Sequence, residues 1–164
     1  MSETIQYELS DSVGTLTITR PARHNSLGGV ELDAMERVLD VISEDPEIRV
    51  LVVTGAGEKT FCAGAAIEDL DSGRITPEGF QKVMHRIAVL PIPTIARVNG
   101  NVFGGGTELA LSCDLRVGVE GTRLRVPAAA LGLCYPPAGI GRFVEKLGAN
   151  TARRMLVASE TFGA

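Results

Sequence analysis

A short glycine run stands directly before a lone carboxylate in the middle of the chain. Residues 104–106 are all glycine, Glu108 follows, and residues 109–111 continue as an apolar helical run. Glycines leave backbone N–H groups accessible, and the start of a helix directs several of them toward one point. Apolar surroundings disfavour the charged form of a carboxyl group, which suits it to proton transfer. We therefore expect an N–H donor at Gly105 beside a buried Glu108; the alternative is a carboxylate that only interacts favourably with the helix dipole.

A second segment of small residues offers donors of the same kind. The sequence Ala63-Gly64-Ala65-Ala66 follows an apolar strand and a glycine turn, and it leads into a short helix. Backbone N–H groups exposed there can hold an anion or a developing oxyanion, whereas tight packing of a strand against a helix is the alternative. The segment matches neither a phosphate-binding loop ending in G-K-[ST] nor a dinucleotide-binding G-x-G-x-x-G turn. Two such loops and one carboxylate make a plausible site for reaction at a carbonyl group.

Alternating strands and helices must position these groups. Apolar–polar alternation predicts a hairpin from 5–9 and 14–19, and helical spacing predicts helices at 28–45 and 76–90. The other expected elements are buried strands at 48–57 and 93–98, a helix ending at 111, strands at 114–119 and 122–126, and helices at 141–148 and 150–159. This order favours an α/β domain with a largely parallel sheet. A spiral of β-β-α units also fits, because the chain starts with a hairpin and its crossovers differ in length.

The composition excludes several classes of protein. The chain has 164 residues, 45% of them hydrophobic, and a net charge of −4, so we expect one globular domain that does not bind nucleic acid. Its apolar runs are too short to span a membrane, and an N-terminus without a basic region or apolar core predicts a cytoplasmic location. The three cysteines (Cys62, Cys113 and Cys134) are expected to be buried free thiols. Their spacing and that of the histidines predict no metal site.

Four segments resemble the crotonase superfamily, the enoyl-CoA hydratase/isomerase proteins. They are RPARHNSL (20–27), LVVTGAGEKTFCAGAAIEDL (51–70), PTIARVNGNVFGGGTELALSCDLRVG (93–118) and RVPAAALGLCYPPAGIGRFVEKLG (125–148). They occur in family order and cover most of the chain, and together they are specific. The resemblance implies a crotonase-like (ClpP/crotonase) spiral of β-β-α units and a lyase or isomerase. It also implies an acyl-CoA thioester substrate, with coenzyme A as part of the substrate and no separate cofactor.

The resemblance assigns roles to individual residues. It implies an oxyanion hole made by the backbone N–H groups of Ala65 and Gly105, with Glu108 as the family's first glutamate. The residues that it implies for contact with coenzyme A are Arg23, Ser26, Leu27, Ala63, Ala65, Ala66, Ile67, Glu68 and Gly105, and Arg20 is a further candidate for a phosphate contact. The oxyanion hole would hold the thioester oxygen as the substrate becomes an enolate.

Two positions depart from the family pattern. Ala66 stands where the family usually has aspartate, and Ala128 stands where two-glutamate hydratases carry their second glutamate. Hydration by one carboxylate is expected to be inefficient, because a water must be positioned while a proton is delivered to the α-carbon. Tyr135 lies close to the missing group, at a spacing similar to that in methylmalonyl-CoA decarboxylase-like proteins. A decarboxylase, a one-base isomerase and a catalytically impaired acyl-CoA-binding protein are therefore alternatives, and Tyr135 is either catalytic or an ordinary buried tyrosine.

The ending SETFGA has neither a helix terminus nor a polar tail. We therefore expect residues 1–164 to be a crotonase-like core domain whose C-terminal helical trimerisation region lies outside this chain. The resemblance implies a homotrimer or hexamer for the longer protein, and a role in fatty acid metabolism.

Overall fold

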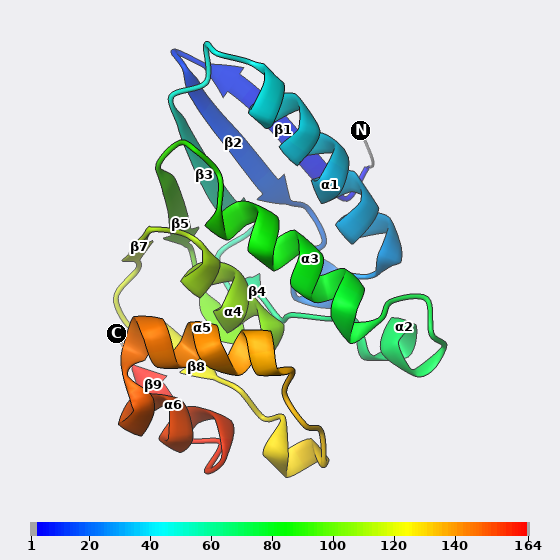
Figure 1. Ribbon diagram of the computed structural model, residues 1–164, viewed down its shortest axis with the longest axis vertical. Helices are drawn as coiled ribbons and strands as arrows, with labels where there is room; N and C mark the ends of the chain where they lie inside the picture. The colour runs from blue at the N-terminus through cyan, green and yellow to red at the C-terminus, as the bar shows by residue number, and fades with distance from the viewer. Residues whose placement is uncertain (1–2, 164) are drawn as a thin grey trace.

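The larger of two sheets carries the N-terminal hairpin at one end. The computed structural model describes residues 3–163, and in it the five strands take the order β1-β2-β3-β5-β7 (Figure 1). These strands are β1 (Ile5–Ser10), β2 (Val13–Ile18), β3 (Val50–Gly55), β5 (Thr94–Val98) and β7 (Leu115–Gly118). Only β1 is antiparallel to its neighbour, so the predicted hairpin and the largely parallel sheet are confirmed.

A smaller sheet contains the three strands that directly follow β3, β5 and β7, together with the last strand of the described residues. Its order is β4-β6-β8-β9, with β4 (Thr60–Cys62), β6 (Asn101–Phe103), β8 (Arg123–Arg125) and β9 (Phe162–Gly163). The chain therefore passes from β3 to β4, from β5 to β6 and from β7 to β8, and helices lead it back to the larger sheet after β4 and after β6. This is the predicted spiral of β-β-α units. The strands β4 and β6 were not predicted, because strands of three residues, flanked by turns, are too short to show a period.

In the described part of the chain, six α-helices connect the strands or follow them. They are α1 (Gly29–Glu44), α2 (Ile67–Asp71), α3 (Pro77–Ala88), α4 (Gly105–Ser112), α5 (Pro137–Leu147) and α6 (Ala149–Leu156). Short 3-10 turns occur at Pro21–Arg23 and Ala129–Leu131. The α5 helix begins four residues earlier than predicted, since Pro137 occupies a first-turn position where a missing N–H is tolerated.

Local sequence explains where the two long helices begin. The Thr76 hydroxyl accepts a hydrogen bond of 3.1 Å from the N–H of Gly79, and Pro77 opens α3. At the start of α1, the Gly28 N–H donates to the carboxylate of Glu31 at 2.8 Å. Arg20 forms an ion pair of 2.7 Å with the same carboxylate, so this arginine has a structural partner within the chain.

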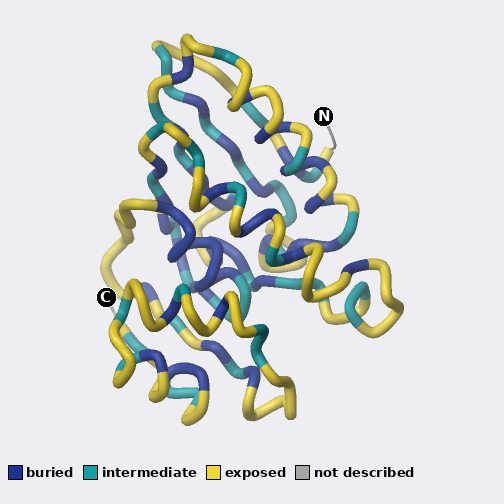
Figure 2. Tube along the Cα trace, in the orientation of Figure 1, coloured by how far each residue is buried: buried dark blue, intermediate teal, exposed yellow. Residues whose placement is uncertain are grey.

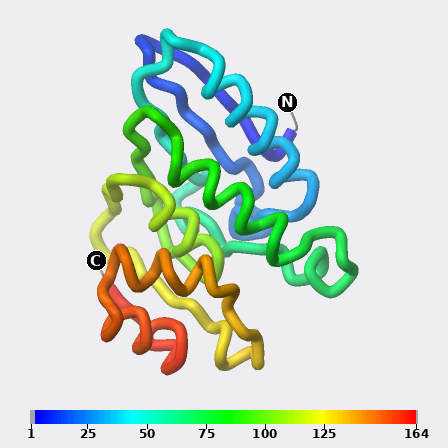
Figure 3. The backbone as a smooth tube through the Cα atoms, viewed as in Figure 1, coloured from blue at the N-terminus to red at the C-terminus, as the bar shows by residue number. Residues whose placement is uncertain are grey.

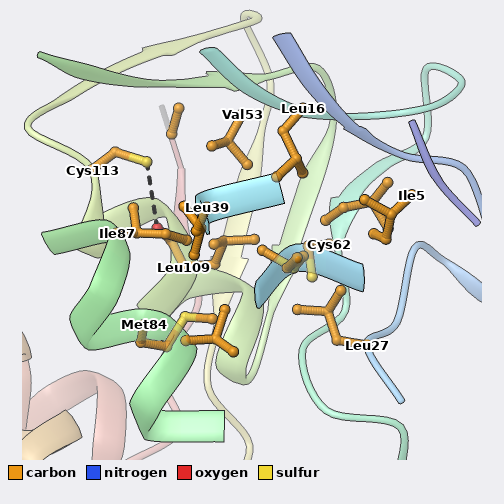
Figure 4. Packing of buried hydrophobic residues seen from close by; sticks show 14 of the residues in the cluster. Ile5, Leu16, Leu27, Leu39, Val53, Cys62, Met84, Ile87, Leu109 and Cys113 are labelled. Atoms are coloured by element: carbon orange, nitrogen blue, oxygen red, sulfur yellow. Dashed lines mark hydrogen bonds between the residues drawn. The ribbon is translucent and has the colours of Figure 1, made fainter. Parts of the chain in front are cut away.

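Apolar side chains from the larger sheet, α1, α3 and α4 form the main core. Leu16 lies beside Val53 in the sheet, and Figure 4 shows both facing Leu39 of α1, with Ile87 of α3 and Leu109 of α4 close by. Figure 2 shows the α4 backbone as buried, and all residues from Gly106 to Ser112 are buried. A second cluster joins α5 and α6 to Ala128 and Val126. The α4 helix thus lies between the two clusters.

The expectation that β3 is buried on both faces is wrong for Val50 and Val52, which are half-buried.

The three cysteines are free, as predicted, but they are not all buried. Burial raises the pKa of the Cys62 thiol to about 12 and that of Cys113 to about 12. The expectation is wrong for Cys134, which is exposed because it follows the Ala129–Leu131 turn in a loop rather than in a regular element. The two buried thiols therefore act as small apolar core residues.

The Tyr7→Phe substitution should stabilise the fold. Within residues 3–163 the buried Tyr7 hydroxyl has no hydrogen-bond partner, and an unsatisfied buried hydroxyl carries a desolvation penalty. Chemical denaturation should show a free energy of unfolding higher by about 1 kcal/mol. Tyr135→Phe is the matched control, because the Tyr135 hydroxyl donates a hydrogen bond of 2.9 Å to Glu108 and its loss should lower stability. Equal effects of the two substitutions would contradict this prediction.

Candidate active site

The α4 helix places Glu108 in its first turn, and the side chain of this residue is completely buried (0% exposed). Three donors reach its carboxylate. The Arg142 guanidinium donates to Oε1 at 2.5 Å, while the Tyr135 hydroxyl and the Gln81 side-chain amide donate to Oε2, each at 2.9 Å. The expected burial is confirmed, but the surroundings are not apolar as expected. Gln81 and Arg142 were not predicted as members of the site.

The charges around Glu108 are balanced inside the protein. The Arg142 side chain is only 10% exposed, so the ion pair is almost fully removed from water. A buried charge needs such a partner because desolvation otherwise costs several kcal/mol. Burial, followed by the negative charge of Glu108 and the hydrogen bond to it, raises the pKa of Tyr135 well above its ordinary value. Tyr135 therefore stays protonated near neutral pH and acts as a hydrogen-bond donor.

The two predicted backbone donors lie where β4 leads into the loop before α2 and where α4 begins. Leu27 donates its N–H to the Gly64 carbonyl at 2.8 Å, and Ala66 donates to the Leu27 carbonyl at 2.8 Å. Because successive N–H groups of an extended segment point in opposite directions, the N–H of Ala65 points away from Leu27. The N–H of Gly105 is at the first position of α4, where no helical acceptor exists. Within residues 3–163, neither N–H group has a hydrogen-bond acceptor.

One cavity of about 480 Å³ brings the backbone donors and the carboxylate together. Ala65, Gly105 and Glu108 all line it, and so do Gln81 and Tyr135. Ile67, Leu70, Phe80, Leu131 and Leu133 contribute an apolar wall. A group with one polar oxygen and an apolar tail can therefore place the oxygen at the N–H pair while it buries the tail.

The residues predicted to contact coenzyme A divide into two sets. Ala63, Ala65, Ile67 and Gly105 line the cavity, whereas Arg23, Ser26, Leu27, Ala66 and Glu68 do not. Arg23 and Glu68 are exposed and form an ion pair of 3.0 Å with each other, Leu27 is buried, and the Ser26 carbonyl accepts from Arg20 at 2.8 Å. Contact with coenzyme A stays a prediction for all of these residues.

Position 128 belongs to the cavity wall. Ala128 is 8% exposed and lines the cavity together with Pro127, Leu131 and Tyr135. Its methyl group cannot transfer a proton, so the carboxylate expected in a two-glutamate hydratase is replaced by an apolar surface. Glu78 also lines the cavity, but it is exposed on the first turn of α3. Glu108 is therefore the buried carboxylate of the site.

The described residues also lack two further kinds of feature, a cluster of metal ligands and a membrane-spanning helix. Among residues 3–163, His, Cys, Asp and Glu side chains form no group of three or more that could hold a metal ion. In the same part of the chain, every helix is too short or too polar to cross a lipid bilayer.

Gln81 and Arg142 join the site only through tertiary packing. Gln81 follows the buried Phe80 on α3, and Arg142 precedes the buried Phe143 on α5, so each lies next to an apolar anchor. Both helices pack against α4, as Figure 3 shows for the green and orange segments. A polar residue beside a buried aromatic residue is a weak sequence signal for a site residue, because such polar residues commonly lie at the border of an amphipathic helix.

Comparison with known proteins identifies relatives across the whole chain. The family model described as enoyl-CoA hydratase/isomerase matches residues 8–164. The chain is 34% identical to the short-chain-enoyl-CoA hydratase of Clostridium acetobutylicum over 96% of the chain and 62% of that protein. It is 35% identical to the carnitinyl-CoA dehydratase of Shigella flexneri over 100% of the chain and 64% of that protein.

Solved structures agree with these sequence relationships. The crystal structure of enoyl-CoA hydratase from Bacillus anthracis superposes with a TM-score of 0.92 at 30% identity, covering 99% of this chain and 65% of that one. The chain thus spans slightly less than two thirds of each of these relatives.

The Gly64→Ala substitution should disrupt the contact between the two donor loops. Gly64 has a φ of 84°, and an added Cβ would collide with the backbone N of Gly105. We expect thermal denaturation to show a loss of more than about 1 kcal/mol, beyond the strain of the left-handed backbone alone. Gly73→Ala is the control for that strain, because Gly73 has a φ of 72° with nothing within 4 Å of the added Cβ. If both variants lose the same stability, the close approach to Gly105 has no energetic role.

Proposed function

Because the chain belongs to the enoyl-CoA hydratase/isomerase family, we propose that the protein acts on an acyl- or enoyl-CoA thioester through an enolate held at an oxyanion hole. The observation that carries this proposal is the pair of free N–H groups, at Ala65 and Gly105, in one cavity with the buried Glu108. The thioester oxygen would accept hydrogen bonds from both groups. Coenzyme A would enter as part of the substrate.

The two halves of the site have complementary tasks. When a proton leaves the α- or γ-carbon of the thioester, the electron pair moves onto the carbonyl oxygen, and fixed N–H donors stabilise the developing charge. The Glu108 carboxylate accepts the departing proton and can return it to another carbon of the same acyl group. Only one base is needed for such a shift, so isomerase chemistry suits this site best.

Tyr135 supplies the other proton-bearing group on the cavity wall. Its phenol is kept protonated and donates a hydrogen bond to Oε2 of Glu108, and both residues line the cavity. A phenol in that place can donate a hydrogen bond to the reacting group when Glu108 takes up a proton. This contribution resembles that of the missing carboxylate at position 128, but it is weaker because a phenol of raised pKa transfers its proton less readily.

A decarboxylase of malonyl-type thioesters is the second candidate. Loss of CO₂ leaves the electron pair of the broken bond on the enolate, so this reaction needs no second carboxylate. The presence of Tyr135 in the cavity wall, and not of a second carboxylate, therefore favours it. The proximity of Glu108 opposes it, since a substrate carboxylate would be repelled by a second negative charge. A protein that binds acyl-CoA without turnover is the third candidate.

Family membership also supports a proposal for the assembly and location of the protein. We propose that the protein forms a homotrimer or hexamer, because Leu131, Leu133, Ile140 and Val144 leave apolar side chains exposed around the end of the cavity and α5. A cytoplasmic location and a role in fatty acid metabolism accord with the free thiols and with the substrate class.

The Glu108→Gln substitution should abolish most turnover. Glutamine preserves the shape of the side chain but cannot accept a proton, so kcat should fall by about 10² to 10⁴-fold. The assay uses the full-length protein and a panel of enoyl-CoA isomers and malonyl-type CoA thioesters, with product analysis by mass spectrometry. Glu120→Gln, in an exposed turn, is the matched control and should retain activity.

The panel also separates the candidate functions. Double-bond migration without added water identifies an isomerase, and release of CO₂ identifies a decarboxylase. Binding of acyl-CoA in calorimetry without turnover identifies the binding protein, and absence of both binding and turnover would reject the proposed function.

The Ala128→Glu substitution should raise hydration of an enoyl-CoA. It adds a second carboxylate to the cavity wall, where a water could be oriented toward the β-carbon. Because a placed acid–base group contributes about 10² to 10⁴-fold, we expect hydration to increase by at least about 10-fold. Ala128→Gln has the same size without the acid–base function and should show no increase. If both variants hydrate equally, position 128 is not what limits that reaction.

A further inference from the structure

The Glu108 carboxylate is held from two sides that differ in their access to the cavity. Gln81 and Tyr135 line the cavity with Glu108, and both donate to Oε2. Arg142 is not among the lining residues and donates to Oε1 from behind. Oε2 therefore has its hydrogen-bond partners among the residues that line the cavity, whereas Oε1 is held by an arginine that does not line it.

Arg142 also orients one of the two cavity-side donors. Its Nη1 donates to the side-chain carbonyl of Gln81 at 3.5 Å, a long hydrogen bond, in addition to its 2.5 Å bond to Glu108. Only one orientation of the Gln81 amide satisfies both neighbours, with Oε1 toward the guanidinium and Nε2 toward Glu108. One cationic group thus fixes the carboxylate directly and the Gln81 donor indirectly.

Burial makes this arrangement dependent on the charge of Arg142. Glu108 is fully buried and Arg142 nearly so, and a buried carboxylate needs a partner of opposite charge to offset its desolvation. The other charged or titratable groups near Glu108 do not replace it. Tyr135 from the loop before α5 is a neutral phenol, Cys62 from β4 is a neutral thiol, and Glu78 from α3 carries a negative charge.

We propose that Arg142 is a positioning residue of the site, which holds Glu108 so that Oε2 faces the substrate and which sets the Gln81 amide that shares this oxygen. The proposal rests on the proposed function, in which Glu108 accepts the substrate proton. Arg142 itself does not touch the substrate. Its effect should therefore fall on the chemical step and not on binding.

The kinetic test compares Arg142→Gln with Arg142→Lys in the full-length protein. A misplaced base loses about 10²-fold in rate, so Arg142→Gln should lower kcat by about that factor while KM stays unchanged. Arg142→Lys keeps the positive charge and should recover most of the loss. Arg153→Gln on α6 removes an exposed arginine and is the matched control, with unchanged kcat. An increase in KM that equals the loss in kcat/KM would overturn the proposal, because it would place Arg142 in substrate binding.

A double substitution tests whether Arg142 acts through Glu108. In a Glu108→Gln background, Arg142→Gln should cause no further fall in kcat, since the group that it positions is already gone. This pair of neutral side chains also avoids an uncompensated buried charge, so it keeps the test decisive if Arg142→Gln alone does not fold. A further fall in kcat in the folded double variant would overturn the proposal.

A spectroscopic measurement separates this inference from the proposed function. In protein labelled with ¹³C at the tyrosine Cζ, the Tyr135 resonance is identified by its loss in Tyr135→Phe, and it reports the hydrogen bond to Glu108. We expect the resonance to shift in Arg142→Gln and to keep its position in Arg142→Lys and Arg153→Gln. An unchanged resonance in folded Arg142→Gln would overturn the positioning role. If the positioning is present and no thioester is turned over, only the proposed function fails.

Discussion

The burial of one carboxylate is the constraint on which the rest of this structure depends. Glu108 has no exposed surface, so its charge must be stabilised by hydrogen-bond donors from inside the protein. Those donors come from α3, from α5 and from the loop before α5. The requirement therefore links three parts of the chain to α4 and explains why polar groups occur between two apolar clusters.

The spiral of strands brings the backbone donors to the same place. The strands β3, β5 and β7 of the larger sheet each continue into a strand of the smaller sheet, and the loops that leave β4 and β6 carry the N–H groups of Ala65 and Gly105. A single bridge between Leu27 and Ala65 fixes the direction of one of them. The donors are thus positioned by backbone pairing, whereas Glu108 is positioned by side chains, so the two halves of the site depend on different interactions.

Local patterns predicted the parts of the molecule that local interactions determine. Periodicity identified α1 and α3, and the glycines before Glu108 indicated both the start of α4 and its N–H donor. The short strands β4 and β6 were not predicted, because their strand conformation depends on pairing with distant strands and not on their own residues. Gln81 and Arg142 were not predicted as site residues for the same reason. Gln81 is separated from Glu108 by 27 positions in the sequence, and Arg142 by 34. Cys134 was misjudged because apolar neighbours in the sequence do not establish burial of a loop.

The placement of α4 has a consequence for how such a site can change over time. The helix begins at the oxyanion donor and carries the carboxylate one turn later, so one rigid segment holds both groups at a fixed separation. Mutations that preserve the fold cannot vary that separation by small steps. Divergence toward new reactions must instead come from the facing wall, where Ala128 and Tyr135 belong to a loop outside the helices. The fold thus combines a half whose separation is fixed by one helix with a facing wall whose side chains can be substituted without changing that separation.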